Sequence, residues 1–243
     1  MFHNTNGGDH IIDKVIDVTG FTLNLRDISM NQNGVADKTI ADKVEEEILF
    51  GRLRPRERLV EDELMERTGA TRHAVRQALV ELEARNLVVR VPNKGAQVRD
   101  FTREDFVQIC QFRDWLHEKA AHSIVLPADP VWFAKLEKLQ RQHDVAVESG
   151  QPVDVHRTNT AFHDELFSGC GNRCLTQTIN EYAKLSLAYR CHLMTRNDLA
   201  LQARDEHRKM IEAIRQGDPV SLASLCVEHT RAARKVYEQI QGW

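Results

Sequence analysis

The chain has 243 residues and a formal net charge of −3, and 42% of its residues are hydrophobic. This length suits one large domain or two ordinary ones, with the composition of a globular protein. The sequence has no run of about 18 apolar residues that could span a membrane. Its first residues lack the basic start and apolar stretch of a secretory signal, so we expect a cytoplasmic protein. The five cysteines are scattered and form no CxxC pair, which favours reduced thiols over a disulfide framework or a zinc ribbon.

Charge is unevenly distributed along the chain. Residues 52–99 contain eleven Arg or Lys against seven Asp or Glu, whereas residues 101–243 contain eighteen against nineteen. A basic segment beside a near-neutral remainder is typical of a small DNA-binding module joined to another domain. Residues 1–35 are polar and end in NQNG. We interpret them as a poorly ordered N-terminal extension and assign them no function.

The first predicted domain spans residues 36–100. Apolar residues at helical spacing predict helices from Asp37 to about Phe50, over 61–67, and from an N-cap at Thr71 onward. Gly69 forms the turn between the second and third helices, and Asn86 follows the third where a left-handed residue is expected. Alternating apolar residues on either side of the turn at residues 92–95 then predict a β-hairpin. This order of elements is the plan of a winged helix-turn-helix.

The third helix carries the candidate DNA-reading residues. Its apolar stripe is Val75, Leu79 and Leu82, and the opposite face carries Arg72, His73, Arg76 and Gln77, next to Thr71. Residues near the start of a recognition helix reach base edges, and the arginine fork suits guanine. The hairpin tip suits a wing beside a phosphate or the minor groove, and it consists of Asn93, Lys94 and Gly95. Basic residues before the second helix are candidates for phosphate contacts: Arg52, Arg54, Arg56 and Arg58. The alternative is that these arginines are only solubilising surface charge.

After Asp100 the pattern is helical throughout. Six helices are predicted, at roughly 103–126, 130–149, 153–168, 173–196, 199–216 and 219–241. Their short connections, marked by Gly, Pro and Asn, favour an antiparallel all-helical bundle over residues 101–243. The fold class is therefore mainly α, with a small hairpin in the first domain.

Five polar residues fall on the apolar stripes of these helices, where an unpaired polar group is costly. They are Arg113, Asn159, His163, His207 and His229. His207 and His229 each lie 11 residues from Asp218, the centre of a predicted turn. In an antiparallel helix pair they therefore sit at the same height, roughly 16 Å from the turn, and should meet.

Asn159 and His163 are four residues apart and could approach the same place from a third helix. Three imidazoles with an amide oxygen suit zinc, nickel or a related divalent metal. The alternative is that each is a hydrogen-bonded core histidine, with Arg113 held by an acid such as Glu118 or Glu181. Further candidates for lining a pocket are Tyr182, Tyr189, Arg190 and Arg196.

The stretch from Ile48 to Val98 resembles the N-terminal domain of GntR-family regulators. The segments of this chain that match the family pattern are ILFGRLRP, LVEDELMERTGATRHAVRQAL and the end of the wing, KGAQV. Arg56 stands where that pattern has glycine, and Asp62 stands where some members carry a DNA-contacting arginine. The resemblance implies sequence-specific binding to an operator.

The later segments resemble the FCD ligand-binding domain of the FadR/VanR branch of that family. They are FRDWLHEKAA, AFHDELFSGCGN and EHRKMIEAIRQGDPVSLASLCVEH. The resemblance implies a divalent metal held by His163, His207 and His229, with Asn159 in place of the usual aspartate. It also implies a carboxylate effector at Arg113, with His117 replacing a glutamate, and the count of six helices favours the VanR subgroup.

The sequence therefore predicts a DNA-binding regulator, a repressor, that forms a homodimer on a palindromic operator and responds to a small carboxylate. The effector residues would be Arg113 and His117 together with the metal-binding set. Two alternatives remain open: a metal-dependent enzyme built on the three histidines, and an interaction module that does not bind DNA. No HExxH motif is present, which disfavours the first.

Overall fold

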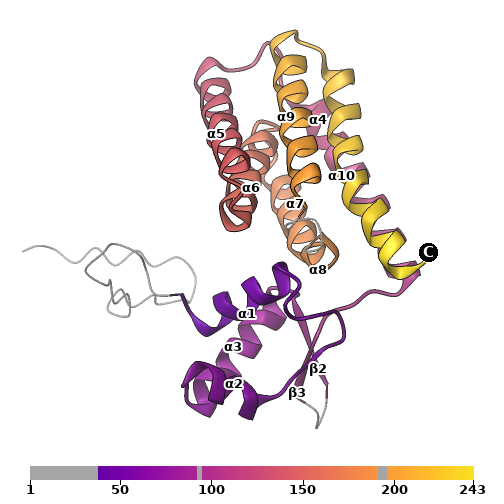
Figure 1. Ribbon diagram of the computed structural model, residues 1–243. Coiled ribbons are helices and arrows are strands. Elements are labelled where there is room, and N and C mark those ends of the chain that lie inside the picture. Colours follow the sequence, from indigo (N-terminus) through magenta and orange to yellow (C-terminus); the bar gives the residue numbers. More distant parts are fainter. Residues whose placement is uncertain (1–37, 92–94, 191–195) are drawn as a thin grey trace, which may run out of the picture. The chain divides into compact units, whose positions relative to one another are not determined.

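The computed structural model describes residues 38–91, 95–190 and 196–243. Within these ranges the chain forms a small winged unit followed by a helical bundle (Figure 1). No helix in these ranges is long and apolar enough to cross a membrane.

The winged unit contains three helices and three strands. They are α1 (Ile40–Leu49), β1 (Arg58–Leu59), α2 (Glu61–Thr68), α3 (Arg72–Ala84), β2 (Val88–Val91) and β3 (Gly95–Val98). The first helix begins later than the predicted Asp37, because Thr39 is its N-cap. The Thr39 hydroxyl accepts from the Asp42 amide and the Asp42 carboxylate accepts from the Thr39 amide, both at 3.1 Å. This capping box stabilises the start of the helix.

The sheet has one strand more than the predicted hairpin. β3 lies in the centre and pairs antiparallel with both β2 and β1. In β1, Arg58 pairs with Gln97 and Leu59 with Ala96. A two-residue strand shows no alternation of its own, so the sequence pattern could not reveal it.

The turns of the winged unit have the backbone geometry expected from the sequence. Gly69 ends α2 at φ 67°, and Asn86 follows α3 at φ 61°. Both values lie in the left-handed region that glycine and asparagine tolerate. The three helices and the sheet enclose one core, made chiefly of Val44, Ile48, Leu59, Leu64, Val75, Leu79, Leu82, Leu87 and Val98.

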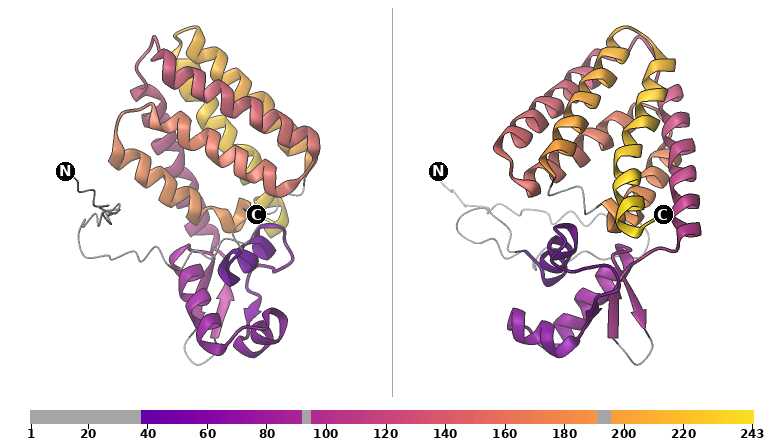
Figure 2. Two further views of the ribbon diagram at one scale, coloured as in Figure 1. Left: turned by 90° about the vertical axis from the view of Figure 1, so that its left-hand side faces the viewer. Right: turned by 45° about the vertical axis from the view of Figure 1, so that its right-hand side comes forward.

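Within the described residues, the bundle contains six long helices and one short one. They are α4 (Arg103–Ser123), α5 (Pro130–Ser149), α6 (Pro152–Ser168), α7 (Arg173–Leu185), α8 (Leu187–Arg190), α9 (Asn197–Arg215) and α10 (Pro219–Gln241). Proline occupies the first turn of α5, α6 and α10, where its missing N–H costs nothing. α10 packs against α4 and α9, and α5 packs against α6 and α9 (Figure 2).

The predicted helix over 173–196 was wrong in its extent. α7 stops at Leu185 and α8 follows after Ser186. The buried Ser186 hydroxyl donates to the Ala183 carbonyl at 2.7 Å, which offers the backbone an alternative to a continuous helix. Residues 191–195, the rest of that predicted helix, lie outside the described residues.

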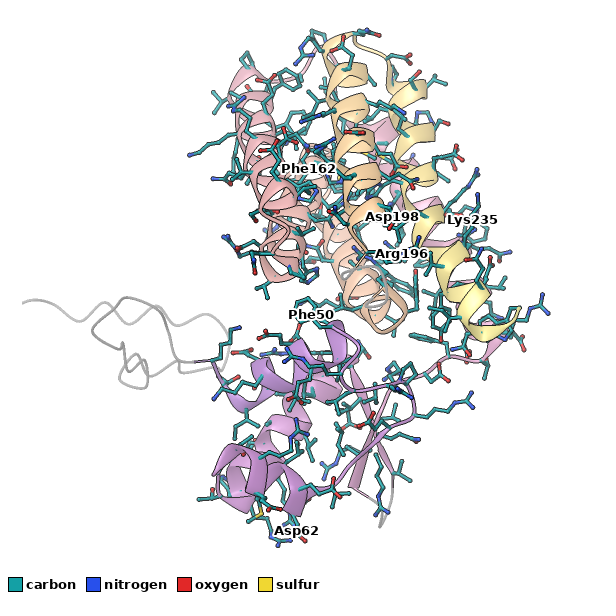
Figure 3. The ribbon with its side chains drawn as sticks, viewed as in Figure 1. Phe50, Asp62, Phe162, Arg196, Asp198 and Lys235 are labelled. Carbon is teal, nitrogen blue, oxygen red and sulfur yellow. The ribbon has the colours of Figure 1, made fainter. Side chains whose placement is uncertain are left out.

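The bundle buries its own apolar core, in which Phe162 is fully covered (Figure 3). The four cysteines in the described ranges are free thiols. Cys110, Cys170 and Cys226 are buried and Cys174 is exposed. Cys191 lies outside the described residues.

Candidate functional site

Helix α3 presents the predicted DNA-reading residues on one exposed face. The Thr71 side chain caps the helix by accepting from the Ala74 amide at 3.3 Å. Val75, Leu79 and Leu82 pack into the core, which leaves the opposite face open to solvent. The exposed residues of that face are Thr71, Arg72, His73, Arg76 and Gln77.

Both arginines of this face are paired with acids in the first turn of α2. Arg72 Nη2 donates to Asp62 Oδ1 at 2.6 Å, and Arg76 Nε donates to the two Glu61 oxygens at 3.0 and 2.9 Å. The Arg72 and Arg76 side chains remain 52% and 57% exposed. Sequence reasoning missed these pairs, although the acidic run Glu61 to Glu63 at the start of the preceding helix was a signal for them.

The wing depends on a glycine. Gly95 has φ 83°, and a Cβ added there would lie 3.0 Å from the Leu59 carbonyl oxygen of β1. The predicted wing-tip residues Asn93 and Lys94 lie outside the described residues. The four arginines predicted to contact phosphate are all exposed: Arg52, Arg54, Arg56 and Arg58.

In the bundle, three predicted histidines meet from three helices. His163 on α6 has its Nε2 atom 3.0 Å from Nε2 of His229 on α10 and 3.2 Å from Nε2 of His207 on α9. His207 and His229, expected at the same height in the α9–α10 pair, have ring centroids 4.9 Å apart. His207 also stacks on Phe162 at a centroid distance of 4.0 Å, which fixes the plane of its ring.

The donor set fits a divalent metal. One nitrogen from each histidine lies within 4.8 Å of the others. Ligand nitrogens about 2.0–2.1 Å from a tetrahedral zinc are about 3.3 Å apart, close to the observed Nε2 separations. Burial, with the nearby His229, lowers the pKa of His163 and of His207 well below the usual imidazole range, so both are in the neutral form that ligates metals. Asn159, one turn before His163, lines a cavity that His163 and His229 also line.

A carboxylate that sequence reasoning missed orients one of these histidines. Glu206 Oε2 lies 2.6 Å from His229 Nδ1, so the imidazole donates from that nitrogen and directs Nε2 at the other two rings. Burial alone would raise the pKa of Glu206, but the hydrogen bond from His229 lowers it below the usual value. The count of residues from the α9–α10 turn could have found this pair.

His163 and His229 line a partly open cavity together with two arginines. Its volume is about 130 Å³, and its walls come from α4, α6, α7, α8, α9 and α10. Arg113 and Arg190 both line it, and neither forms an ion pair with an acid of the described residues. Burial and the nearby Arg113 lower the pKa of Arg190 to about 10, which still leaves it charged at neutral pH.

The environment of Arg113 rules out the acids considered from the sequence. Glu118 and Glu181 are exposed, and the buried Arg113 instead donates from Nη1 to the Tyr189 hydroxyl at 2.7 Å. Its Nε atom is buried without a hydrogen-bond partner. His117, one turn later, lines the cavity, and burial and Arg113 lower its pKa well below the usual range.

Of the other pocket candidates, only Arg190 lines this cavity. Tyr189 is not part of the cavity lining, and its hydroxyl accepts the hydrogen bond from Arg113. Tyr182 packs on Phe112 at a centroid distance of 4.7 Å. Arg196 is paired with Asp198, its Nε lying 3.1 Å from Oδ1 (Figure 3). A core histidine does occur nearby: the fully buried His143 lies 2.9 Å through Nδ1 from the Thr158 hydroxyl.

Comparison with known proteins places both parts of the chain. Residues 36–98 match the family of bacterial regulatory proteins named gntR, and residues 108–232 match the FCD domain. The chain is 26% identical to the transcriptional regulator YdhC of Bacillus subtilis over 70% of this chain and 76% of YdhC. It is 22% identical to the transcriptional repressor GlaR of Escherichia coli, over 79% and 91%.

Solved structures show the same fold. The E. coli protein McbR/YncC aligns with a TM-score of 0.67 at 18% identity, over 83% of this chain and 96% of McbR. A regulator from Rhodococcus sp. RHA1 aligns with a TM-score of 0.63 at 20% identity, over 84% and 96%. The matched families and relatives are transcriptional regulators and not enzymes, which removes the enzyme alternative. The chain thus belongs to the GntR family of DNA-binding transcriptional regulators and carries an FCD domain at its C-terminal side.

Proposed function

We propose that this regulator is a repressor whose affinity for operator DNA is controlled by a small carboxylate bound in its bundle. Residues 36–100 read the DNA, through the exposed face of α3, the wing and the nearby arginines. Residues 101–243 bind the effector and join two chains into a homodimer, which suits a palindromic operator. The designation of the relative GlaR as a repressor supports the same sign of control.

The observation that carries this proposal is the chemistry of the cavity. The imidazoles of His117 and His163 and two arginines face one small, partly open cavity. Its lining acids are Asp164 and Glu206, and no acid of the described residues pairs with either arginine. An unpaired buried charge is costly. A small organic anion would remove that cost, and the volume suits a molecule in the size class of benzene, which a cavity of about 150 Å³ holds.

The metal-binding residues would be His163, His207 and His229 with the Asn159 amide oxygen. When bound, zinc or nickel would supply a Lewis-acidic position for a carboxylate oxygen. Arg113 and His117 would orient the rest of the effector, since Arg113 has a buried Nε without a partner. The effector would release DNA by binding one of two poses of the protein more tightly than the other.

The test is metal analysis of the purified protein beside His163→Ala and His229→Ala, with His122→Ala as the control because that histidine is exposed near the end of α4. We expect about one metal per chain in the wild type and in the control, and none in the two cluster variants. The wild-type complex with duplex DNA should then dissociate when small carboxylates are added. Unchanged metal content in both cluster variants would refute the site, and a footprint strengthened by carboxylate would refute release.

A further inference from the structure

The two arginines of α3 engage the acids of α2 through different nitrogens. Arg76 uses only its Nε, which donates to both oxygens of Glu61. Arg72 uses the end of its guanidinium: Nη2 is 2.6 Å from Asp62 Oδ1, and Nη1 is 3.8 Å from Glu61 Oε2. Glu61 therefore lies beside Nε of Arg76, whereas Asp62 lies at the terminal nitrogens of Arg72.

This difference matters because arginine reads guanine with a fork of two N–H groups. In Arg76 both Nη nitrogens are left without a partner among the described residues, while the bond at Nε restrains the side chain. In Arg72 one Nη nitrogen of the fork is already hydrogen-bonded to Asp62. Arg76 is thus ready to meet a base edge, and Arg72 must first leave Asp62.

The two acids also differ in how firmly they are held. The Glu61 side chain is 20% exposed, whereas Asp62 is 72% exposed at the surface of the winged unit (Figure 3). A half-buried carboxylate bridging two arginines is a stable support. An exposed pair is weak and can be exchanged for a better acceptor.

We propose that Glu61 is a positioning residue that holds Arg76 for guanine, and that Asp62 is a lock on Arg72 that limits binding to unsuitable DNA. The inference rests on the proposed reading role of α3. A duplex with an acceptor in the right place draws Arg72 away from Asp62. A duplex without one leaves Arg72 paired and meets the Asp62 carboxylate beside its own phosphates, so the lock acts mainly on non-specific binding.

The experiment uses full-length Asp62→Asn and Glu61→Gln. The control is Glu63→Gln, which removes the same charge from the same turn of α2. Glu63 is exposed and has no ion pair or hydrogen bond within the described ranges. The probes are a duplex selected by the wild type from a library randomised over two half-sites, and a scrambled duplex of equal composition. Affinities are measured against salt concentration, and folding is checked by thermal unfolding.

Relative to Glu63→Gln, Asp62→Asn should bind the scrambled duplex about 2- to 5-fold more tightly, with a smaller gain on the selected duplex. Glu61→Gln should lose about 5-fold or more on the selected duplex and little on the scrambled one. Equal effects of Asp62→Asn and Glu63→Gln would overturn the lock, because charge alone would then explain them. Equal losses of Glu61→Gln on both duplexes would overturn its positioning role. A wild type without salt-dependent DNA binding would instead refute the reading role of α3 itself.

Discussion

At the level of single residues, the metal-binding set proposed above contains no charged side chain among the described residues. Asn159 stands where the FCD pattern has aspartate, and an amide oxygen brings no charge to a divalent ion. The acid bonded to the cluster is Glu206, whose Oε2 lies 2.6 Å from His229 Nδ1. A carboxylate behind a ligating imidazole raises its basicity and fixes its orientation. Glu206 can therefore supply, through His229, part of the charge that Asn159 omits.

Glu206→Gln should weaken metal binding by about 10- to 100-fold. Glutamine can still accept from His229, so the variant removes the charge while the ring keeps its direction. Metal affinity is measured by competition with a chelator of known strength. The control is Glu212→Gln, on the same helix but paired with Arg215 at the surface. Wild-type affinity in Glu206→Gln would show that the carboxylate charge is irrelevant to the cluster.

At the level of elements, α5 and α6 are in contact where the Trp132 ring covers Gly169. The Trp132 indole of α5 donates from Nε1 to the Glu165 carbonyl at 2.9 Å. Its six-membered ring lies over Gly169 at the end of α6, where a Cβ would come within 2.4 Å of the ring. The backbone of Gly169 is ordinary right-handed helix, so the requirement for glycine there is purely steric. This contact sets how closely the helix that bears Asn159 and His163 approaches α5.

Gly169→Ala should destabilise the protein by about 1–3 kcal/mol, because the tryptophan must move. The free energy of unfolding is measured in urea. Trp132→Phe removes the ring atoms that clash, so the double variant should be less destabilised than the sum of the two single variants. Strict additivity of the two changes would contradict the steric account.

At the level of the whole molecule, the proposed homodimer needs a surface on the bundle. Trp115 on α4 is 65% exposed, an unusual position for so large a ring. It lies edge-on to Phe112, which packs on Tyr182 of α7. Exposed aromatic clusters are typical of protein interfaces. We expect this cluster to lie between the two chains of a dimer.

Trp115→Glu should therefore weaken the dimer and, with it, binding to a two-half-site duplex, while leaving the fold intact. Sedimentation velocity over a concentration series measures the change in assembly. Val131→Glu is the matched control, because Val131 is 79% exposed at the start of α5, whereas the cluster residues lie on α4 and α7. A dimer of equal strength in Trp115→Glu would place the interface elsewhere.

The sequence pattern was enough to predict those helices, caps and turns whose geometry depends on nearby residues. Helical spacing, the Thr71 cap and left-handed Asn86 predicted the winged unit, and counting from Asp218 predicted that His207 and His229 meet. The same logic explains a departure from the GntR pattern, since Arg56 has φ 65°, a left-handed conformation suited to the glycine of that pattern. These features follow from backbone sterics and helix geometry, which act over a few residues.

The sequence by itself thus determined the family, the two kinds of domain and the three histidines that form the cluster, His163, His207 and His229. Only the tertiary structure decided which groups face them across the bundle. Glu206 behind His229, Tyr189 behind Arg113 and Asp62 across Arg72 are contacts between different helices. The short strand β1 likewise depends on its pairing with Ala96 and Gln97, far along the chain. Such pairings depend on packing geometry in three dimensions, and no periodicity along the chain records them.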